Sequence, residues 1–310
     1  MSESKYIGSL PLLHGLSVLL FICSPSFSPS GSGYETLVVR RVGDGGKVAI
    51  VSLNRPKVYN AVNMQMLLDF ATCMRDVDGD NSIHVIIFSG GASKHFCCKL
   101  HTQQRLTKSC GNTYGMLTTA GADLEELKTD GITFANMLST FHCITNVRKP
   151  VIAAVTGVAL GGGCEIALMC DIVYCGSSSR FALPEVTHGT IPGCGGTQRL
   201  TAAVGKSRAM EMILSGDRIT AQEAVMWGLA SRVFPDDEVL DQAISLAHRI
   251  AAHSPVIVGM AKKSIKAFVD HSLSGMQVER DMFQATLETE ARREGVAAYE
   301  KKKNRANGNL

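Results

Sequence analysis

The sequence predicts an α/β fold in which short buried strands alternate with amphipathic helices, followed by a region of helices alone. Two observations predict it. Short apolar runs bounded by turn residues alternate with segments whose apolar residues recur at helical spacing. Beyond Gly216 the periodic segments have helical spacing. Alternation of this kind is typical of layered α/β domains.

The strands are predicted from compact apolar runs, and the first helix from its period and its cap. The runs are short and rich in Val and Ile, as expected of buried strands; they cover residues 48–53, 85–88, 151–155 and 172–174. Residues 64–74 form the first predicted helix, and Asn63 is placed to cap its N-terminus.

The C-terminal region is predicted to be helical throughout. Thr220 and Glu223 have the spacing of a capping box, and Gly228 suits the end of the helix that this box opens. Three longer amphipathic helices are expected over residues 237–252, 255–269 and 276–291. Such helices usually bury one face in the core of their own domain, so the pattern alone defines no partner interface.

Three parts of the chain follow from these patterns: a leader or disordered segment at 1–33, an α/β core at 34–215, and the helical region at 216–310. The apolar stretch 8–23 contains a proline and a histidine and is too short for a comfortable membrane span. It is more similar to the apolar part of a signal peptide than to an Arg-rich presequence.

Composition fits a globular enzyme and excludes several other classes. Of 310 residues, 45% are hydrophobic and 19% charged, and the net charge of +3 gives no argument for nucleic-acid binding. The ten cysteines include no Cys-x-x-Cys pair, which favours free thiols in a reducing compartment and no structural metal. Phosphate-binding, dinucleotide-binding, zinc-protease and serine-hydrolase motifs are all absent from the sequence.

The run from Gly161 to Glu165 is the most informative feature. A strand, a glycine turn and a helix start would expose unpaired first-turn N–H groups beside a carboxylate. Such a pairing suits chemistry in which negative charge develops on an oxygen. The alternative is a glycine-rich turn in which Glu165 only complements the helix dipole.

Two further acids lie at predicted helix starts. Glu185 follows Pro184, which fits a first helical position, and Asp123 follows a turn of small residues. Each of these acids could be an ordinary first-turn acid or cap. A catalytic site is favoured because all three acids, Asp123, Glu165 and Glu185, lie at predicted helix starts in this order along one chain.

At these residues the chain resembles the crotonase superfamily, and most closely its mitochondrial short-chain enoyl-CoA hydratases. The resemblance covers the chain from about residue 34 to the C-terminus, and its matching stretches are 54–57 with 60–61, 120–124, 149–155, 159–165 and 189–200. It implies a fold of ββα repeats wound into a superhelix, with a C-terminal helical region that forms trimer contacts.

The resemblance also implies a role for each site residue. The backbone N–H groups of Ala122 and Gly162 would form an oxyanion hole for the thioester oxygen. Glu165 would activate the attacking water and Glu185 would protonate the α-carbon, while the pattern leaves open which glutamate holds the proton at rest. The implied contacts with the acyl-CoA involve Lys57, Ala122, Asp123, Leu124, Glu125, Gly162 and Gly193.

Several broader expectations come with the family. No cofactor is needed, because coenzyme A is part of the substrate. The expected assembly is a homotrimer or homohexamer without a membrane span, and nucleic-acid binding by some relatives is a minor alternative. The expected location is the mitochondrial matrix, with the cytosol as the alternative. The presence of both glutamates favours a hydratase over an isomerase.

The chain departs from the family pattern at two places. Residues 98–119 intervene where relatives run almost directly into the Ala-Gly-Ala-Asp turn, and this stretch lacks any sustained period, so an irregular loop is expected. It would be either a tolerated lid or the mark of a splice product that joins oligomers without activity. Glu125 stands where many relatives carry lysine, which should weaken polyphosphate binding unless Lys128 or Lys57 compensates.

Overall fold

The computed structural model describes residues 33–100, 118–119 and 139–269, together with positions between 280 and 301. The main sheet has six strands in the order β1-β2-β3-β6-β8-β11. Their bounds are β1 Leu37–Val42, β2 Val48–Leu53, β3 Val85–Ser89, β6 Val151–Val155, β8 Ile172–Gly176 and β11 Arg232–Phe234. β1 pairs with β2 in antiparallel fashion, and the remaining neighbours are parallel.

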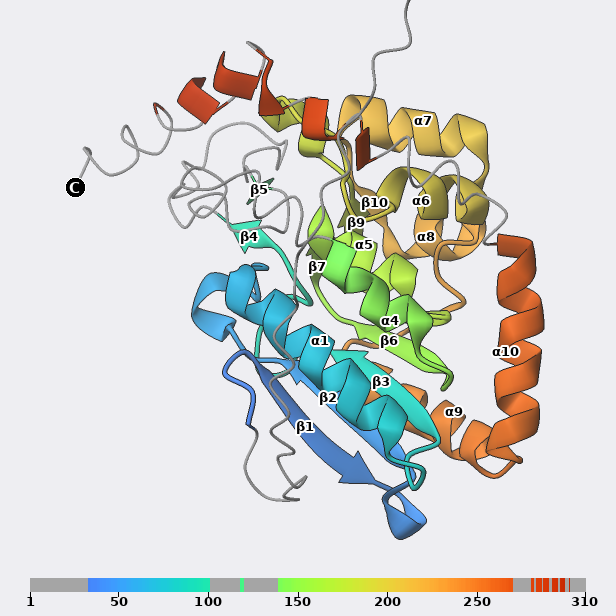
Figure 1. The fold of residues 1–310 in the computed structure, drawn as a ribbon. Helices are drawn as coiled ribbons and strands as arrows, with labels where there is room; N and C mark the ends of the chain where they lie inside the picture. Colours follow the sequence, from blue (N-terminus) through green and yellow to red (C-terminus); the bar gives the residue numbers. More distant parts are fainter. Residues whose placement is uncertain are drawn as a thin grey trace, which may run out of the picture.

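Both faces of the main sheet are covered, which is why its strands appear as unbroken apolar runs. On β2, Val48 and Ile50 pack in one cluster with helix α9 (Val239–Ala251), whereas Ala49 and Val51 pack in the larger cluster that includes α1 (Met64–Gly79). Figure 1 shows α1 in front of the sheet and α9 behind it. The strand predictions at 48–53, 85–88, 151–155 and 172–174 are confirmed, two of them with short extensions.

A second, three-stranded sheet contains the strands that directly precede α5 (Gly162–Met169) and the 3-10 helix η4 (Glu185–His188). It has the order β10-β9-β7, with β7 at Val158–Leu160, β9 at Arg180–Ala182 and β10 at Ile219–Thr220. Consecutive strands β6 and β7 enter different sheets before α5, and β8 and β9 do the same before η4. Two β-strands followed by a helix therefore form the repeating unit.

The remaining elements agree closely with the cap signals in the sequence. Asn63 accepts a hydrogen bond from the Met66 N–H at 3.1 Å at the start of α1, which runs to Gly79 rather than to residue 74. The capping box at Thr220 and Glu223 is formed, and Gly228 ends that helix in the left-handed region. The other helices are η1 Asp44–Gly46, η2 Pro56–Val58, η3 Ser139–Phe141, α4 His142–Asn146, α6 Gly196–Val204, α7 Lys206–Ser215, α8 Ala221–Trp227 and α10 Pro255–Val269.

The observed bounds of the two long C-terminal helices α9 and α10 can be compared with the predicted ones. α9 begins at Val239, two residues later than predicted, whereas α10 has the predicted bounds. In the predicted helix 276–291, residues 280–281, 283–285 and 287 are helical, whereas 276–279, 282, 286, 290 and 291 lie outside the described residues. Within the described residues, every helix is too short or too polar to span a bilayer.

The two ends of the 98–119 stretch pair with each other. β4 (Lys99–Leu100) and β5 (Thr118–Thr119) are antiparallel, with Lys99 opposite Thr119 and Leu100 opposite Thr118. The prediction of an irregular loop is therefore wrong at these ends, while residues 101–117 lie outside the described residues. Since paired strands lie about 5 Å apart, the chain leaves and returns at nearly the same place.

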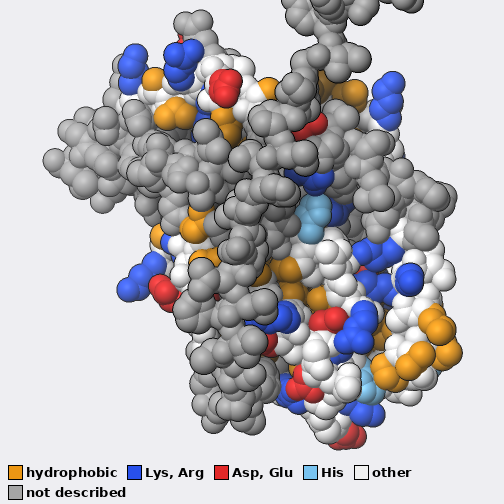
Figure 2. Space-filling view, viewed as in Figure 1, with side chains coloured by type: hydrophobic (Ala, Val, Ile, Leu, Met, Phe, Trp, Pro, Cys, Tyr) orange, Lys and Arg blue, Asp and Glu red, His pale blue; other side chains and the backbone are white. Residues whose placement is uncertain are grey.

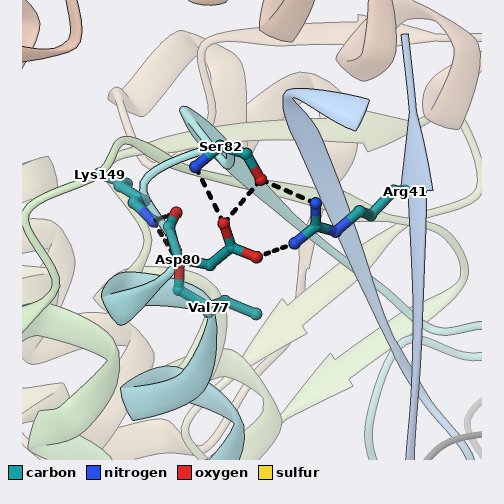
Figure 3. Close-up of polar contacts among 5 residues, drawn as sticks. All are labelled: Arg41, Val77, Asp80, Ser82 and Lys149. Atoms are coloured by element: carbon teal, nitrogen blue, oxygen red, sulfur yellow. Dashed lines mark hydrogen bonds and ion pairs between the residues drawn. The ribbon is translucent and has the colours of Figure 1, made fainter. Parts of the chain in front are cut away.

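A polar network joins β1, the end of α1 and the start of β6 (Figure 3). Lys149 is buried, and its Nζ donates to the Asp80 carbonyl at 2.6 Å and to the Val77 carbonyl. Arg41 bonds the Asp80 carboxylate and donates to Ser82 Oγ at 2.8 Å. Burial lowers the pKa of the Lys149 ammonium to about 8, although the nearby Asp78 and Asp80 oppose this shift.

Replacing Lys149 with methionine should change how stability depends on pH. The folded-state pKa lies below the value of about 10.4 for an unfolded lysine, so between pH 8 and 10 the unfolded chain binds more protons. The free energy of unfolding of the wild type should therefore rise with pH relative to Lys149→Met over this window. Urea denaturation at several pH values measures it, with the exposed Lys206→Met as control. A flat or falling difference would contradict the prediction.

Candidate active site

Helix α5 starts against two other segments, and glycine is required at both contacts. Gly161 has φ of 51°, and its N–H donates to the Ala182 carbonyl at 2.9 Å, which ties the helix start to the end of β9. At Gly163, a Cβ atom would overlap the carbonyl oxygen of Cys97. The start of α5 is thereby pressed onto both the Cys97 segment and the strand that leads to Glu185.

Gly162 is the first residue of α5, where a backbone N–H has no intrahelical acceptor. Within the described part of the chain, no acceptor is paired with this N–H. The predicted oxyanion donor is thus placed at the positive end of a helix dipole. Its expected partner Ala122 lies outside the described residues.

Glu165 is buried, with 3% of its surface exposed, and its carboxylate is held by a different helix. Its Oε1 accepts hydrogen bonds from the N–H groups of Cys194 and Gly196, each at 2.8 Å. Gly196 is the first residue of α6, so the carboxylate lies at the N-terminus of that helix. Backbone donors and a helix N-terminus both favour the ionised form of a carboxyl group.

Glu185 is also buried, at 5% exposure, and is the first residue of η4. The interpretation of Pro184 as a first helical position is wrong by one residue, because Pro184 is the N-cap of this 3-10 turn. Glu185 follows Ala182 by three residues, and Ala182 is paired with Leu160 at the end of β7. The pairing of β7 with β9 therefore brings the two acids to the same place.

The Cys164 thiol shows that both carboxylates are near. Burial raises its pKa well above the usual range, and the charges of Glu185 and Glu165 raise it further. A thiol with a raised pKa is a poor nucleophile, because the thiolate is the reactive form. Cys164 is fully buried in the larger hydrophobic cluster, so it serves in packing.

Asn60 joins the Lys57 turn to the segment that approaches α5. Its side chain is fully buried; it accepts from the Arg55 N–H at 2.9 Å and donates to the Gly90 and Phe96 carbonyls at 2.9 and 3.0 Å. Phe96 directly precedes Cys97, whose carbonyl meets Gly163. Lys57 itself is exposed on η2, where its ammonium can reach an anionic ligand.

The other predicted substrate contacts divide into two groups. Gly193 lies beside Cys194, and a Cβ atom at Gly193 would stand 2.8 Å from Cδ2 of Phe283. The remaining residues, Ala122, Asp123, Leu124 and Glu125, lie outside the described residues.

The sequence pattern did not predict which N–H groups donate to Glu165. The N–H groups of Cys194 and Gly196 come from a glycine-rich run before a helix, the same signal that marked Gly162. That signal predicts N–H groups without intrahelical acceptors, but it does not identify the carboxylate that accepts their hydrogen bonds. Phe283 and Arg292 were also missed, because their contacts span about ninety to one hundred residues of sequence.

This arrangement offers three functions in one place. A carboxylate held ionised by N–H donors can accept a proton from water, and a second buried carboxyl can donate one. The Gly162 N–H can stabilise an oxyanion that develops on a substrate carbonyl. Fold and site define a protein that adds or removes a small group beside an activated carbonyl.

Comparisons with known proteins agree with this class. The sequence model of the family described as Enoyl-CoA hydratase/isomerase matches residues 43–119 and 112–308. A mitochondrial enoyl-CoA hydratase from Pongo abelii is 38% identical over 287 residues, covering 90% of each chain. A 2,3-dehydroadipyl-CoA hydratase from Escherichia coli is 38% identical over 262 residues, covering 83% of this chain and 93% of the relative.

Among solved structures, a carnitinyl-CoA hydratase from Mycobacterium avium superposes with a TM-score of 0.72 at 29% identity, covering 86% of this chain and 96% of that one. The protein belongs to the enoyl-CoA hydratase/isomerase family, as the resemblance of its motifs predicts.

Replacing Gly196 with alanine should reduce activity while the fold persists. The new Cβ would stand 2.8 Å from Glu165 Oε1 and 2.9 Å from Pro192 Cβ, so the carboxylate must shift. Since misplacement by about 1 Å can cost roughly 10²-fold in rate, we expect kcat to fall at least about tenfold. Steady-state hydration of crotonyl-CoA measures it. Gly79→Ala, where a Cβ meets nothing within 4 Å, is the control and should match the wild type.

Proposed function

We propose that this protein is an enoyl-CoA hydratase, a hydro-lyase that adds water across the 2,3 double bond of a short- or medium-chain 2-enoyl-CoA thioester. The observation that carries the proposal is the pair of buried glutamates, Glu165 and Glu185, beside the Gly162 N–H. The hydratase names of the relatives support the same activity. The product is a 3-hydroxyacyl-CoA, and coenzyme A belongs to the substrate rather than to the enzyme.

The proposed reaction uses each group once. Glu165 takes a proton from water as the water oxygen bonds to carbon 3, and the π electrons move toward the thioester oxygen. The N–H groups of Gly162 and Ala122 stabilise the enolate oxygen. Glu185 then gives its proton to carbon 2, and the carbonyl reforms.

The hydrogen bonds at Glu165 support one assignment of the resting proton. Its Oε1 accepts two N–H donors, which favours the ionised form of this glutamate. Two neighbouring buried carboxylates are costly when both are charged, so the proton resides on Glu185. Glu165 then begins the cycle as the base and Glu185 as the acid. An isomerase commonly needs only one acid, so the pair favours hydration.

Both glutamates should be essential for hydration. Glu165→Gln and Glu185→Gln keep the size of each side chain but remove its proton transfer, which typically contributes about 10²–10⁴-fold. Loss of enoyl-thioester absorbance measures the rate, and the exposed Glu211→Gln on α7 is the control. Full activity in either active-site variant would exclude the mechanism.

The paired ends of the 98–119 stretch support an active enzyme rather than a silent subunit. The β4–β5 pairing returns Thr119 beside Lys99, so the chain reaches Ala120 close to the point from which it left. Loop-closure entropy costs only about 0.6 kcal/mol for each doubling of length, so such an insertion is tolerable.

Exchange of residues 101–117 for Asn-Gly tests this point. This dipeptide favours the two-residue turn that can join Leu100 to Thr118 in the observed register. We expect the shortened protein and the full chain to hydrate crotonyl-CoA at rates within about threefold of each other, because the register of β4 with β5 is kept. Activity confined to the shortened protein would instead identify this chain as an impaired form.

Substrate contacts and assembly complete the proposal. Lys57 would meet the phosphates of coenzyme A, and Asp123, Leu124, Glu125 and Gly193 would line the thioester. A homotrimer or homohexamer is supported by the exposed apolar residues Val256, Ile257 and Met260 on α10. Figure 2 shows a hydrophobic patch at the lower right, on the side where α10 lies in Figure 1. Sedimentation equilibrium should give three or six times the chain mass of 33.2 kDa, whereas a monomer would contradict this assembly.

The proposed location is the mitochondrial matrix. The mitochondrial enoyl-CoA hydratase from Pongo abelii supports this location, while other relatives are bacterial. A fluorescent fusion to the C-terminus, imaged with a matrix marker, would separate this location from the cytosol.

A further inference from the structure

We infer that the C-terminal segment of this same chain positions both catalytic turns, through Arg292 at the Glu185 turn and Phe283 at the Glu165 turn. The inference rests on the proposed roles of the two glutamates. It makes Arg292 and Phe283 positioning residues, which act through the backbone rather than on the substrate.

Arg292 holds the last carbonyl of the turn that begins with Glu185. Its side chain is buried, at 7% exposure, and its Nη1 donates to the His188 carbonyl at 3.1 Å. The last carbonyls of a helical turn have no acceptor role within the turn, so a donor from another segment can pair with one of them. A cation at a helix C-terminus is also favourable for the dipole.

Arg292 is buried, so its hydrogen bond to the His188 carbonyl differs from an exposed surface pair. Burying a cation is costly unless it is paired and hydrogen-bonded. Within the described residues, its guanidinium meets a backbone carbonyl and no carboxylate. The guanidinium is therefore placed to hold the backbone of the Glu185 turn.

The same turn packs beside Gly216 at the end of α7 and has hydrogen bonds of its own. Thr187 Oγ1 donates to the Pro184 carbonyl at 2.7 Å, and the Gly189 N–H donates to the Val186 carbonyl at 3.2 Å. Both of these bonds lie inside the turn. The Arg292 contact instead reaches across 104 residues and links the turn to the C-terminal segment.

Phe283 makes the corresponding contact at the second turn. It is buried, at 7% exposure, and Gly193 approaches its ring so closely that a Cβ would stand 2.8 Å from Cδ2. Gly193 directly precedes Cys194, whose N–H is one of the two donors to Glu165. The ring therefore backs the turn that orients the base.

The two contacts predict separable effects. Hydration needs both glutamates. Exchange of an α-hydrogen of saturated butyryl-CoA in D2O uses the oxyanion donors and Glu185 in the ionised form that hydration leaves, with the proton on Glu165. The Glu185 carboxylate removes a proton and the C–H electron pair moves toward the thioester oxygen. The new Glu185 carboxyl exchanges its proton for a deuteron from D2O and returns that deuteron to the carbon. A disturbed Glu185 turn should slow both reactions, and a disturbed Glu165 turn should slow hydration more.

The experiment measures both reactions in full-length Arg292→Met, Arg292→Lys and Phe283→Leu, with the exposed Arg293→Met as control. We expect Arg292→Met to lower kcat for hydration and the exchange rate by at least about tenfold, with KM within about threefold. Arg292→Lys keeps a donor and should recover part of the loss. Phe283→Leu should lower hydration several-fold more than exchange, and Arg293→Met should match the wild type.

Other outcomes would overturn the inference. It is wrong if Arg292→Met behaves like Arg293→Met, or if only KM changes, since the segment would then only cover the substrate. It is also wrong if Phe283→Leu slows exchange as much as hydration. Thermal melting identifies unfolded variants, and Arg292→Gln replaces Arg292→Met if the latter does not fold. A wild type that exchanges but does not hydrate would instead refute the proposed function, and the inference with it.

Discussion

The hydrogen bonds from two backbone N–H groups to Glu165 are the contact on which the geometry of this site depends. A buried carboxylate would be costly without partners, and here the donors come from Cys194 and Gly196 at the start of α6. Since Glu165 itself lies in the first turn of α5, one side chain links the N-termini of two helices. Their positive ends therefore converge on the region where negative charge develops during the reaction.

This convergence requires close backbone packing, which explains where glycine is indispensable. A Cβ at Gly163 would overlap the Cys97 carbonyl, and one at Gly196 would crowd Oε1 of Glu165. Both glycines lie at the first turn of a helix. An added Cβ would push the Cys97 backbone away from Gly163 and the Glu165 carboxylate away from Gly196. Some glycines of these motifs are therefore needed because they allow neighbouring atoms to approach closely. Others, such as Gly161 and Gly195, also have a positive φ that favours glycine.

The second sheet positions Glu185 relative to Glu165. β7 and β9 pair in parallel with Leu160 opposite Ala182, so the residues that follow each strand emerge side by side. A one-residue slip in this register would turn the paired side chains to the opposite face of the sheet and separate the acids. The small β7–β9–β10 sheet is short, yet it determines the relative position of both acids.

Local signals were sufficient for much of the fold. The apolar run at Val48–Leu53, the cap at Asn63 and the capping box at Thr220 all predicted what the structure contains, because each depends on neighbours in sequence. The three-residue strands β7 and β9 were not predicted, since so few residues show no period and their partners are remote.

The same division applies to the site. The order of residues along the chain was enough to identify Glu165, Glu185 and Gly162 as candidates, because a glycine turn followed by an acid at a helix start is a local pattern. Which donors hold Glu165, how β7 aligns with β9, and how Phe283 and Arg292 reach the two turns were decided only by tertiary structure. Contacts of this kind depend on the distance between remote backbones, and a one-dimensional pattern carries no information about that distance.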